Sequence, residues 1–259
     1  MSVYAVADLH GNLILADKIL NFLKPEDTLY FLGDAADRGS DGLAIMEKFL
    51  SAPNVVYLKG NHEEFFEFCV PLMLKHLRGD FVEQNFFSFF YQWIDLNGGL
   101  PTWTATTERT EKEIAEILDK IRKLPLTATY HSPAGNVVIL EHAGFTPGIY
   151  RKTHDSLWDR DHFQDEWPEG LVPDNLYVVH GHTPVQYLKY YYDYDGRAPY
   201  TKEELFYKRD WNKGHSIDEK PTIIRYCSGH KFDIDMCTIS SNRVALLNLD
   251  TFEEIYFDE

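Results

Sequence analysis

The chain of 259 residues is poor in cysteine, has no long apolar run and contains far fewer basic than acidic residues. Its three cysteines, Cys69, Cys227 and Cys237, have no CxxC spacing, which excludes a thiolate metal site and is typical of a reducing, intracellular protein. No window is apolar enough to predict a transmembrane helix, so no membrane association is expected.

The shortage of basic residues leaves a formal net charge of -16, from 41 acidic and 25 basic side chains. Non-specific nucleic-acid binding needs a basic surface, so no stable nucleic-acid partner is expected. A chain this acidic needs local cations, either arginines or metal ions, to bind a phosphorylated substrate. The N-terminal stretch MSVYAVADLHGN lacks the basic region and apolar run of a signal peptide, and a cytoplasmic location is therefore expected.

The first third of the chain alternates short β-branched runs with helical apolar spacing. It predicts strands over 3–8, 27–34 and 54–61, with helices over 13–23 and 41–50. Strands separated by helices of this length pair in parallel, in a sheet covered on both faces. The pattern therefore indicates an α/β protein.

Later segments have other patterns. Residues 64–124 are aromatic and amphipathic and are interpreted as a helical insertion, with Ile114, Ile117, Leu118 and Ile121 on one helix face. Pro133-Ala134-Gly135 predicts a hairpin turn, 190–220 a loop-rich excursion, and the short strands after 221 suit a meander. Without an internal repeat or low-complexity linker, a single domain over 1–259 is expected.

Five predicted strands each finish with a His, Asp or Asn beside a glycine. In chain order the motifs are DLHG (8–11), GDAADRG (33–39), GNHE (60–63), HAG (142–144) and GHTP (181–184). Ligands of open α/β sheets bind outside the carboxyl ends of the strands, so these motifs are expected to converge. The glycines permit the tight turns that aim side chains inward.

The side chains of these motifs are more than one metal ion can use. Imidazoles, carboxylates and a carboxamide suit a pair of divalent or trivalent ions such as Mn, Fe or Zn. One bridging carboxylate would hold both ions, and a metal-bridging water would become the nucleophile for phosphoester cleavage. A single His at a strand end is more often structural, and it is the ordered set of five motifs that argues for a metal site.

The same ordered set resembles the phosphoprotein phosphatase family of calcineurin-like metallophosphoesterases, in the prokaryotic and phage branch that includes symmetrical dinucleoside tetraphosphatases. Further matches are Asn97-Gly98-Gly99 followed by Thr102, Leu157-Trp158 with Arg160 nearby, and Phe232-Asp233-Ile234-Asp235. The resemblance implies a β-sandwich flanked by helices. The usual Thr-Gly after the last motif is Met236-Cys237 here, which leaves the role of Asp235 open.

The resemblance also implies a role for each motif residue. Asp8 and His10 would bind the first metal, Asp34 would bridge, and Asn61, His142 and His182 would bind the second. His62 would be the general acid, oriented by Asp37, and Arg38 would bind phosphate oxygens. Arg160 is a second candidate for phosphate binding, and its alternative is a surface arginine paired with Asp159 or Asp161.

The function expected from these residues is two-metal-dependent phosphomonoester hydrolysis like that of a serine/threonine protein phosphatase. A symmetrical dinucleoside polyphosphate hydrolase is the enzymatic alternative, and an inactive metal-binding scaffold is the alternative of another class. The substrate is accordingly expected to be a phosphorylated protein or a nucleotide. The helical insertion and the tyrosine-rich 190–207 stretch are expected to line the entrance and set substrate choice.

Overall fold

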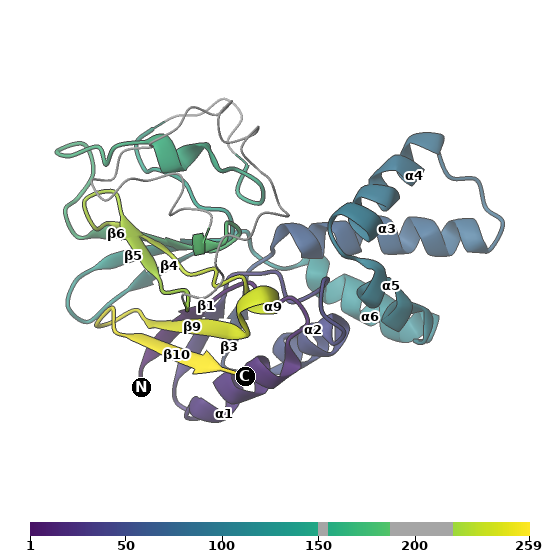
Figure 1. Cartoon of the computed structure of the whole chain (residues 1–259), viewed down its shortest axis with the longest axis horizontal. Coiled ribbons are helices and arrows are strands. Elements are labelled where there is room, and N and C mark those ends of the chain that lie inside the picture. Colours follow the sequence, from purple (N-terminus) through teal and green to yellow (C-terminus); the bar gives the residue numbers. More distant parts are fainter. Residues whose placement is uncertain (150–154, 187–219) are drawn as a thin grey trace.

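The computed structural model describes residues 1–149, 155–186 and 220–259. These residues form two five-stranded sheets, the first of which begins at the N-terminus. Its strand order is β10-β9-β1-β2-β3 (Figure 1). Its strands are β1 (Val3–Val6), β2 (Thr28–Phe31), β3 (Val55–Tyr57), β9 (Arg243–Asn248) and β10 (Glu254–Asp258). The first three run parallel and are connected by α1 (Leu13–Phe22) and α2 (Gly42–Ser51), as the sequence predicts.

The second sheet has the order β4-β5-β6-β8-β7. Its strands are β4 (Thr127–His131), β5 (Val137–Glu141), β6 (Leu176–His180), β7 (Ile224–Tyr226) and β8 (Lys231–Asp233). The central strands β5, β6 and β8 are parallel, and the two edge strands are antiparallel to their neighbours. The hairpin predicted around Pro133-Ala134-Gly135 joins β4 to β5.

The C-terminal strands do not form the predicted meander. β7 and β8 complete the second sheet, whereas β9 and β10 extend the first, and the short helix α9 (Thr238–Ser241) connects the two hairpins. The meander was wrong because β8 pairs with β6 whereas β9 pairs with β1, so the two hairpins join different sheets. Phe232 packs in the core between the sheets, and Val244 packs against the helices.

The two sheets face each other across a core built by strand alternation. Val3 and Ala5 of β1 pack with Val138 and Val179 of the second sheet, between the two layers. Tyr4 and Val6, which alternate with them along the strand, pack with residues of α1 and α2 on the opposite face. Side chains of a strand alternate between its faces, so β1 is apolar on both and its sheet is covered twice. The expected β-sandwich flanked by helices is confirmed.

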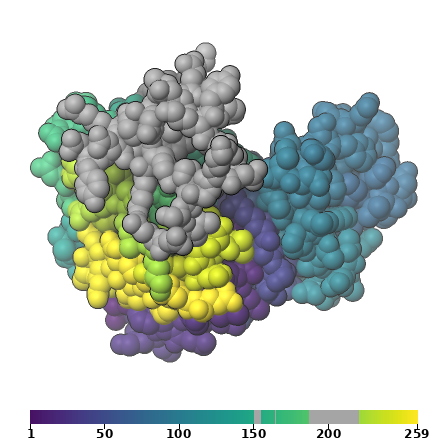
Figure 2. Space-filling model, in the orientation of Figure 1, coloured from purple at the N-terminus to yellow at the C-terminus, as the bar shows by residue number. Residues whose placement is uncertain are grey.

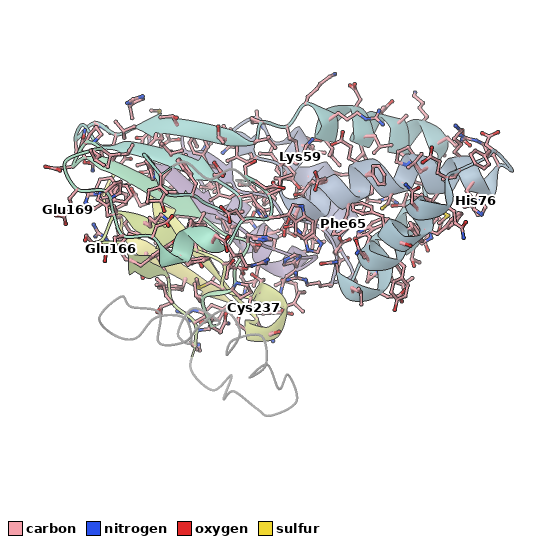
Figure 3. The ribbon with its side chains drawn as sticks, turned by 90° about the horizontal axis from the view of Figure 1, so that it is seen from above. Lys59, Phe65, His76, Glu166, Glu169 and Cys237 are labelled. Atoms are coloured by element: carbon pink, nitrogen blue, oxygen red, sulfur yellow. The ribbon has the colours of Figure 1, made fainter. Side chains whose placement is uncertain are left out.

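Further helices occupy 61–122 and lie to one side of the sheets (Figures 1 and 2). They are α3 (Asn61–Leu77), α4 (Gln84–Tyr91), the π-helix η1 (Gln92–Leu96), α5 (Leu100–Thr107) and α6 (Glu111–Arg122). Seen from above, Phe65 lies where these helices meet the sheets, and His76 lies at the far end (Figure 3). The predicted apolar face of α6 is buried in the core shared with the first sheet.

Beyond the sheets, a short 3₁₀ helix, η2 (Asp161–Gln164), follows β5. The predicted excursion over 190–220 lies outside the described residues except for its last position. The assignment of the whole chain to one domain, with an insertion over 64–124, stays a prediction.

Candidate metal centre

The ends of five parallel strands bring the predicted motifs to one place between the sheets. The loops after β1 and β2 carry Asp8, His10 and Asp34, and Asn61 is the first residue of α3, after β3. The loops after β5 and β6 carry His142 and His182. All six side chains are buried. The convergence follows from topology, because parallel strands end at the same edge of their sheet.

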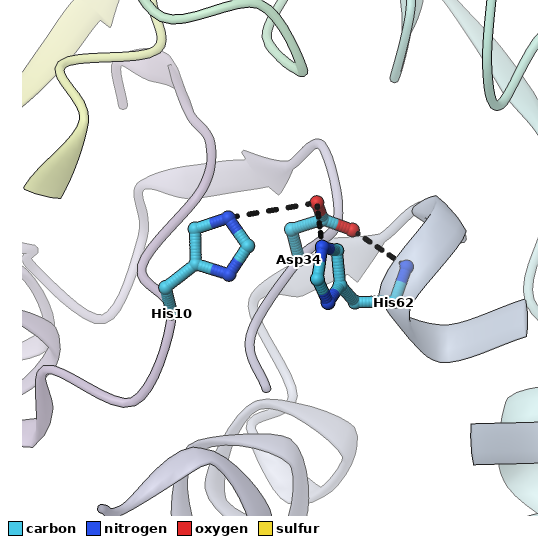
Figure 4. Close-up of side chains that lie close together, drawn as sticks. All are labelled: His10, Asp34 and His62. Atoms are coloured by element: carbon cyan, nitrogen blue, oxygen red, sulfur yellow. Dashed lines mark hydrogen bonds and ion pairs between the residues drawn. The ribbon is translucent and has the colours of Figure 1, made fainter. Parts of the chain in front are cut away.

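Asp34 lies at the centre of this cluster. Its Oδ2 is 3.7 Å from His10 Nε2, 3.8 Å from His62 Nε2 and 3.5 Å from His142 Nε2 (Figure 4 shows the first two). Two groups with metal-ligating geometry share this residue. One adds His10 and His62, and the other adds His142 and His182.

Asn61 and Asp8 both contact His182. Asn61 Oδ1 is 2.9 Å from His182 Nδ1 and 2.8 Å from His142 Nε2. Asp8 Oδ2 accepts a hydrogen bond from the His182 amide at 3.0 Å, and Asp8 Oδ1 lies 3.9 Å from His10 Nε2. The six predicted metal ligands are therefore gathered into one site, with His62 beside them.

The backbone around the site is unusual. Six of the ten predicted site residues have a positive φ, although none is glycine: Asp8, His10, Asp34, Asp37, Arg38 and His182. Such conformations cost about 1–3 kcal/mol each and cluster at functional sites, where the surrounding structure enforces them. A side chain at Gly60 would collide with the Asp34 carboxylate, so glycine is required there.

Backbone carbonyls orient two of the imidazoles. His10 Nδ1 donates to the Ala36 carbonyl at 2.9 Å, and His142 Nδ1 donates to the Leu32 carbonyl at 2.8 Å. Each bond leaves Nε2 facing Asp34. Metal-binding histidines use such a bond to fix the ring and its tautomer.

The electrostatics of the site favour neutral His10 and His182 beside an ionised Asp34, whereas Asp34 raises the pKa of His142 against the effect of its burial. Burial lowers the pKa of His10 well below its usual value, with Arg38 as a second cause. Burial likewise lowers the pKa of His182, followed by the effect of Arg160. Burial by itself would raise the pKa of Asp34, but the nearby His142 and His62 outweigh it and hold that pKa well below the usual range. Neutral imidazole and ionised carboxylate are the forms that bind metal ions.

Three buried atoms identify the space that a cation would fill. Within the described residues, Asp8 Oδ1, His10 Nε2 and His182 Nε2 have no hydrogen-bond partner. Burial, with Asp235 and Asp34 as further causes, raises the pKa of Asp8 well above its usual value. Bound cations would offset that cost and give the three atoms partners. The residues therefore fit a metal centre with nitrogen and oxygen ligands.

The predicted acid–base pair is also assembled. His62 Nδ1 donates to Asp37 Oδ2 at 2.6 Å, and both side chains are buried. The exposed Arg38 places Nη2 3.3 Å from His62 Nε2. The loop is held by Thr102, whose Oγ1 accepts from the Asp37 amide, and by Gly98, whose carbonyl accepts from the Arg38 amide.

Arg160 and Asp235 lie at the periphery. The Arg160 guanidinium donates to Thr183 Oγ1 at 3.0 Å and to the His182 carbonyl at 3.3 Å, so it lies on the site side of η2. Asp235 is buried and accepts from the Cys237 amide at 2.7 Å. Burial raises the pKa of Asp235 to about 6.

The sequence assigned no role to two tryptophans that contact the site residues. Trp93 donates its indole N–H to Asp37 Oδ2 at 2.8 Å, and Trp158 donates to Glu64 Oε2 at 2.8 Å while its ring packs edge-on against His182. Trp158 belongs to the Leu157-Trp158 match, which hinted at proximity. Trp93 had no such indication, because it lies 56 residues from its partner.

The chain belongs to the calcineurin-like phosphoesterase family, whose family model matches residues 1–231. The family predicted from the motifs is therefore confirmed. The search of curated proteins found no match.

Solved structures share the fold at low sequence identity. A candidate diadenosine tetraphosphatase has a TM-score of 0.52 at 15% identity, over 98% of this chain and 92% of that one. A metallophosphoesterase from Sphaerobacter thermophilus has a TM-score of 0.50 at 16% sequence identity, over 99% of this chain and 87% of that one. A serine/threonine protein phosphatase from Saccharomyces cerevisiae has a TM-score of 0.50 at 12% sequence identity, over 100% of this chain and 80% of that one. At these identities the similarity concerns the fold.

Among the residues that the structure describes, none of the helices combines the length and apolar character needed to cross a membrane.

Proposed function

We propose that the chain is a two-metal-dependent phosphohydrolase that cleaves phosphomonoesters in the manner of serine/threonine protein phosphatases. The observation that carries the proposal is the place of Asp34 in both groups with metal-ligating geometry. Two ions that share one carboxylate are the known arrangement for in-line phosphoester displacement. When bound, such ions polarise the phosphoryl oxygens and supply an activated water.

The residues divide between the two ions as the family resemblance implies. Asp8 and His10 would hold the first ion, Asn61, His142 and His182 would hold the second, and Asp34 would serve both. Mn, Fe and Zn all accept this mixture of nitrogen and oxygen ligands. The carboxamide oxygen of Asn61 limits the negative charge near an incoming phosphate.

His62 is the proposed general acid, and Arg38 the proposed phosphate ligand. The Asp37 carboxylate engages His62 Nδ1 and leaves Nε2 toward the site, where it can give a proton to the leaving oxygen. Arg38 is exposed beside that nitrogen and offers a bidentate fork to phosphate oxygens. Arg160, which donates to the His182 carbonyl, is a second phosphate ligand in this proposal.

A dinucleoside polyphosphate is the second candidate substrate. The fold similarity to the candidate diadenosine tetraphosphatase, over 98% of this chain and 92% of that one, supports it. An inactive scaffold is disfavoured, because such a protein is expected to have lost a metal ligand, His62 or Arg38. This chain retains all of them. The free cysteines support a reducing, cytoplasmic setting.

The deciding experiment is hydrolysis of p-nitrophenyl phosphate by metal-stripped protein before and after addition of Mn. We expect turnover only after addition, and equal rates with and without metal would refute the proposal. A panel of phosphoserine peptides, phosphothreonine peptides and diadenosine tetraphosphate, compared by kcat/KM, then separates the two substrate classes. A preference for the dinucleotide would replace the protein phosphatase assignment.

A further inference from the structure

Trp93 is a second hydrogen-bond donor to the carboxylate that orients His62. Its Nε1 lies 2.8 Å from Asp37 Oδ2, and His62 Nδ1 lies 2.6 Å from the same oxygen. All three side chains have an exposure of 0%. Because one oxygen accepts both bonds, the position of the carboxylate relative to the imidazole depends on the indole.

The chain builds this contact from the π-helix η1 and the turn that follows it. π-Helical turns are rare and occur frequently at functional sites. A side chain on Gly99 would put its Cβ 2.5 Å from Trp93 Nε1, so only glycine leaves room for the indole in this position.

Three aromatic side chains fix the indole ring. Phe66, Phe90 and Trp103 pack edge-on against Trp93, with ring centroids 6.4, 5.8 and 6.5 Å away. Edge-to-face pairs at these separations are favourable and directional. The ring is therefore held from several sides, with its N–H aimed at Asp37.

We propose that Trp93 is a positioning residue for proton transfer to the leaving group. Its N–H holds the Asp37 carboxylate so that His62 Nδ1 stays engaged and Nε2 faces the site. The proposal rests on the proposed function and gives the helices over 61–122 a part in the chemistry. A side chain from η1 thereby controls an imidazole on α3.

The step that depends on this geometry is protonation of the departing oxygen. As water forms a new P–O bond, the bond to the leaving oxygen breaks and its electron pair stays on that oxygen. The oxygen takes the Nε2 proton of His62, and a proton lost by the attacking water restores the imidazolium. A displaced imidazole slows this step most for a basic leaving group, which needs the proton most.

Trp93→Phe tests the proposal, since it keeps an aromatic ring and removes the N–H. We expect kcat for phenyl phosphate to fall roughly 10-fold or more and kcat for p-nitrophenyl phosphate to fall less than about threefold, with little change in KM. Trp103→Phe is the matched control. It keeps an aromatic ring packed against Trp93 and removes only the indole N–H of residue 103, so it is expected to leave the ratio of the two rates unchanged.

Gly99→Ala provides a second test of the proposal. Its added methyl group would collide with the Trp93 indole, so the substitution displaces the ring but retains the indole N–H. It is expected to change the ratio of rates in the same direction as Trp93→Phe. A direct readout uses metal-free protein with ¹⁵N-labelled tryptophan. Asp37→Asn is expected to shift the indole N–H resonance of Trp93, which is assigned by its loss in Trp93→Phe, and to leave that of Trp103 in place.

Two results would overturn the inference. One is an equal fall in both rates for Trp93→Phe, which indicates a purely structural role. The other is an unchanged indole resonance in Asp37→Asn. If the unsubstituted protein hydrolyses neither ester, the proposed function fails, and the resonance experiment still decides whether Trp93 donates to Asp37.

Discussion

Glu63 accepts a hydrogen bond from the backbone amide of Asp34 at 2.8 Å, and through this contact it fixes the loop that carries the central carboxylate. The amides of Ala35 and Gly60 and the hydroxyl of Tyr57 donate to the same side chain, at 2.9, 2.8 and 2.8 Å. Glu63 is fully buried. It therefore ties the ends of β2 and β3 to the first turn of α3.

Glu63→Ala is expected to lower the free energy of unfolding by about 3 kcal/mol, because it leaves three buried amides without an acceptor. Urea denaturation followed by circular dichroism measures the change. Glu116→Ala, on the exposed face of α6, is the control and is expected to cost less than about 0.5 kcal/mol. A loss below about 1 kcal/mol for Glu63→Ala would show that water replaces its contacts.

Asp34→Asn is expected to remove most of the bound metal. The substitution keeps the volume of the side chain but removes the negative charge that the two metal-ligating groups share. Inductively coupled plasma mass spectrometry after loading with Mn and desalting is expected to give about two ions per chain for the unsubstituted protein and fewer than about one for the variant. Asp119→Asn, on the exposed face of α6, is expected to match the unsubstituted protein. Full metal content in Asp34→Asn would exclude a bridging role.

The convergence of the site was predictable because its information is local. Each motif follows its own strand, and parallel pairing of β1, β2 and β3 requires His10, Asp34 and Asn61 to emerge at one edge. The glycines identified the turns. The family resemblance also implied the pairing of His62 with Asp37, which the structure brings within 2.6 Å.

Contacts between distant elements were not predictable. Trp93 meets Asp37 only because α3, α4 and α5 pack in one particular arrangement, and apolar helices carry no local pattern that specifies it. The C-terminal strands posed the same difficulty. Strands of three to six residues predict hairpins, but which sheet each hairpin joins depends on the edges left open after the rest has folded.

Cys69 is expected to resist alkylation in the native protein. Its side chain is fully buried in α3, and burial, followed by the nearby Asp37, raises the pKa of its thiol to about 12. Because the thiolate is the reactive form, iodoacetamide at pH 8 is expected to modify Cys69 only after urea is added. Mass spectrometry of the peptides gives the extent at each site, with the partly exposed Cys227 and Cys237 as internal references. Rapid native modification of Cys69 would show that α3 opens from the core.

His62→Asn tests whether His62 is the proposed general acid or a metal ligand. The variant lacks the proposed proton donor but keeps a polar side chain at the start of α3, so kcat for p-nitrophenyl phosphate is expected to fall at least about 100-fold while Mn content stays near that of the unsubstituted protein. His76→Asn, near the exposed end of the same helix, is expected to change neither quantity (Figure 3). If His62→Asn instead loses metal in proportion to activity, His62 is a ligand. That result would assign the group formed by His10, Asp34 and His62 to metal binding as a whole.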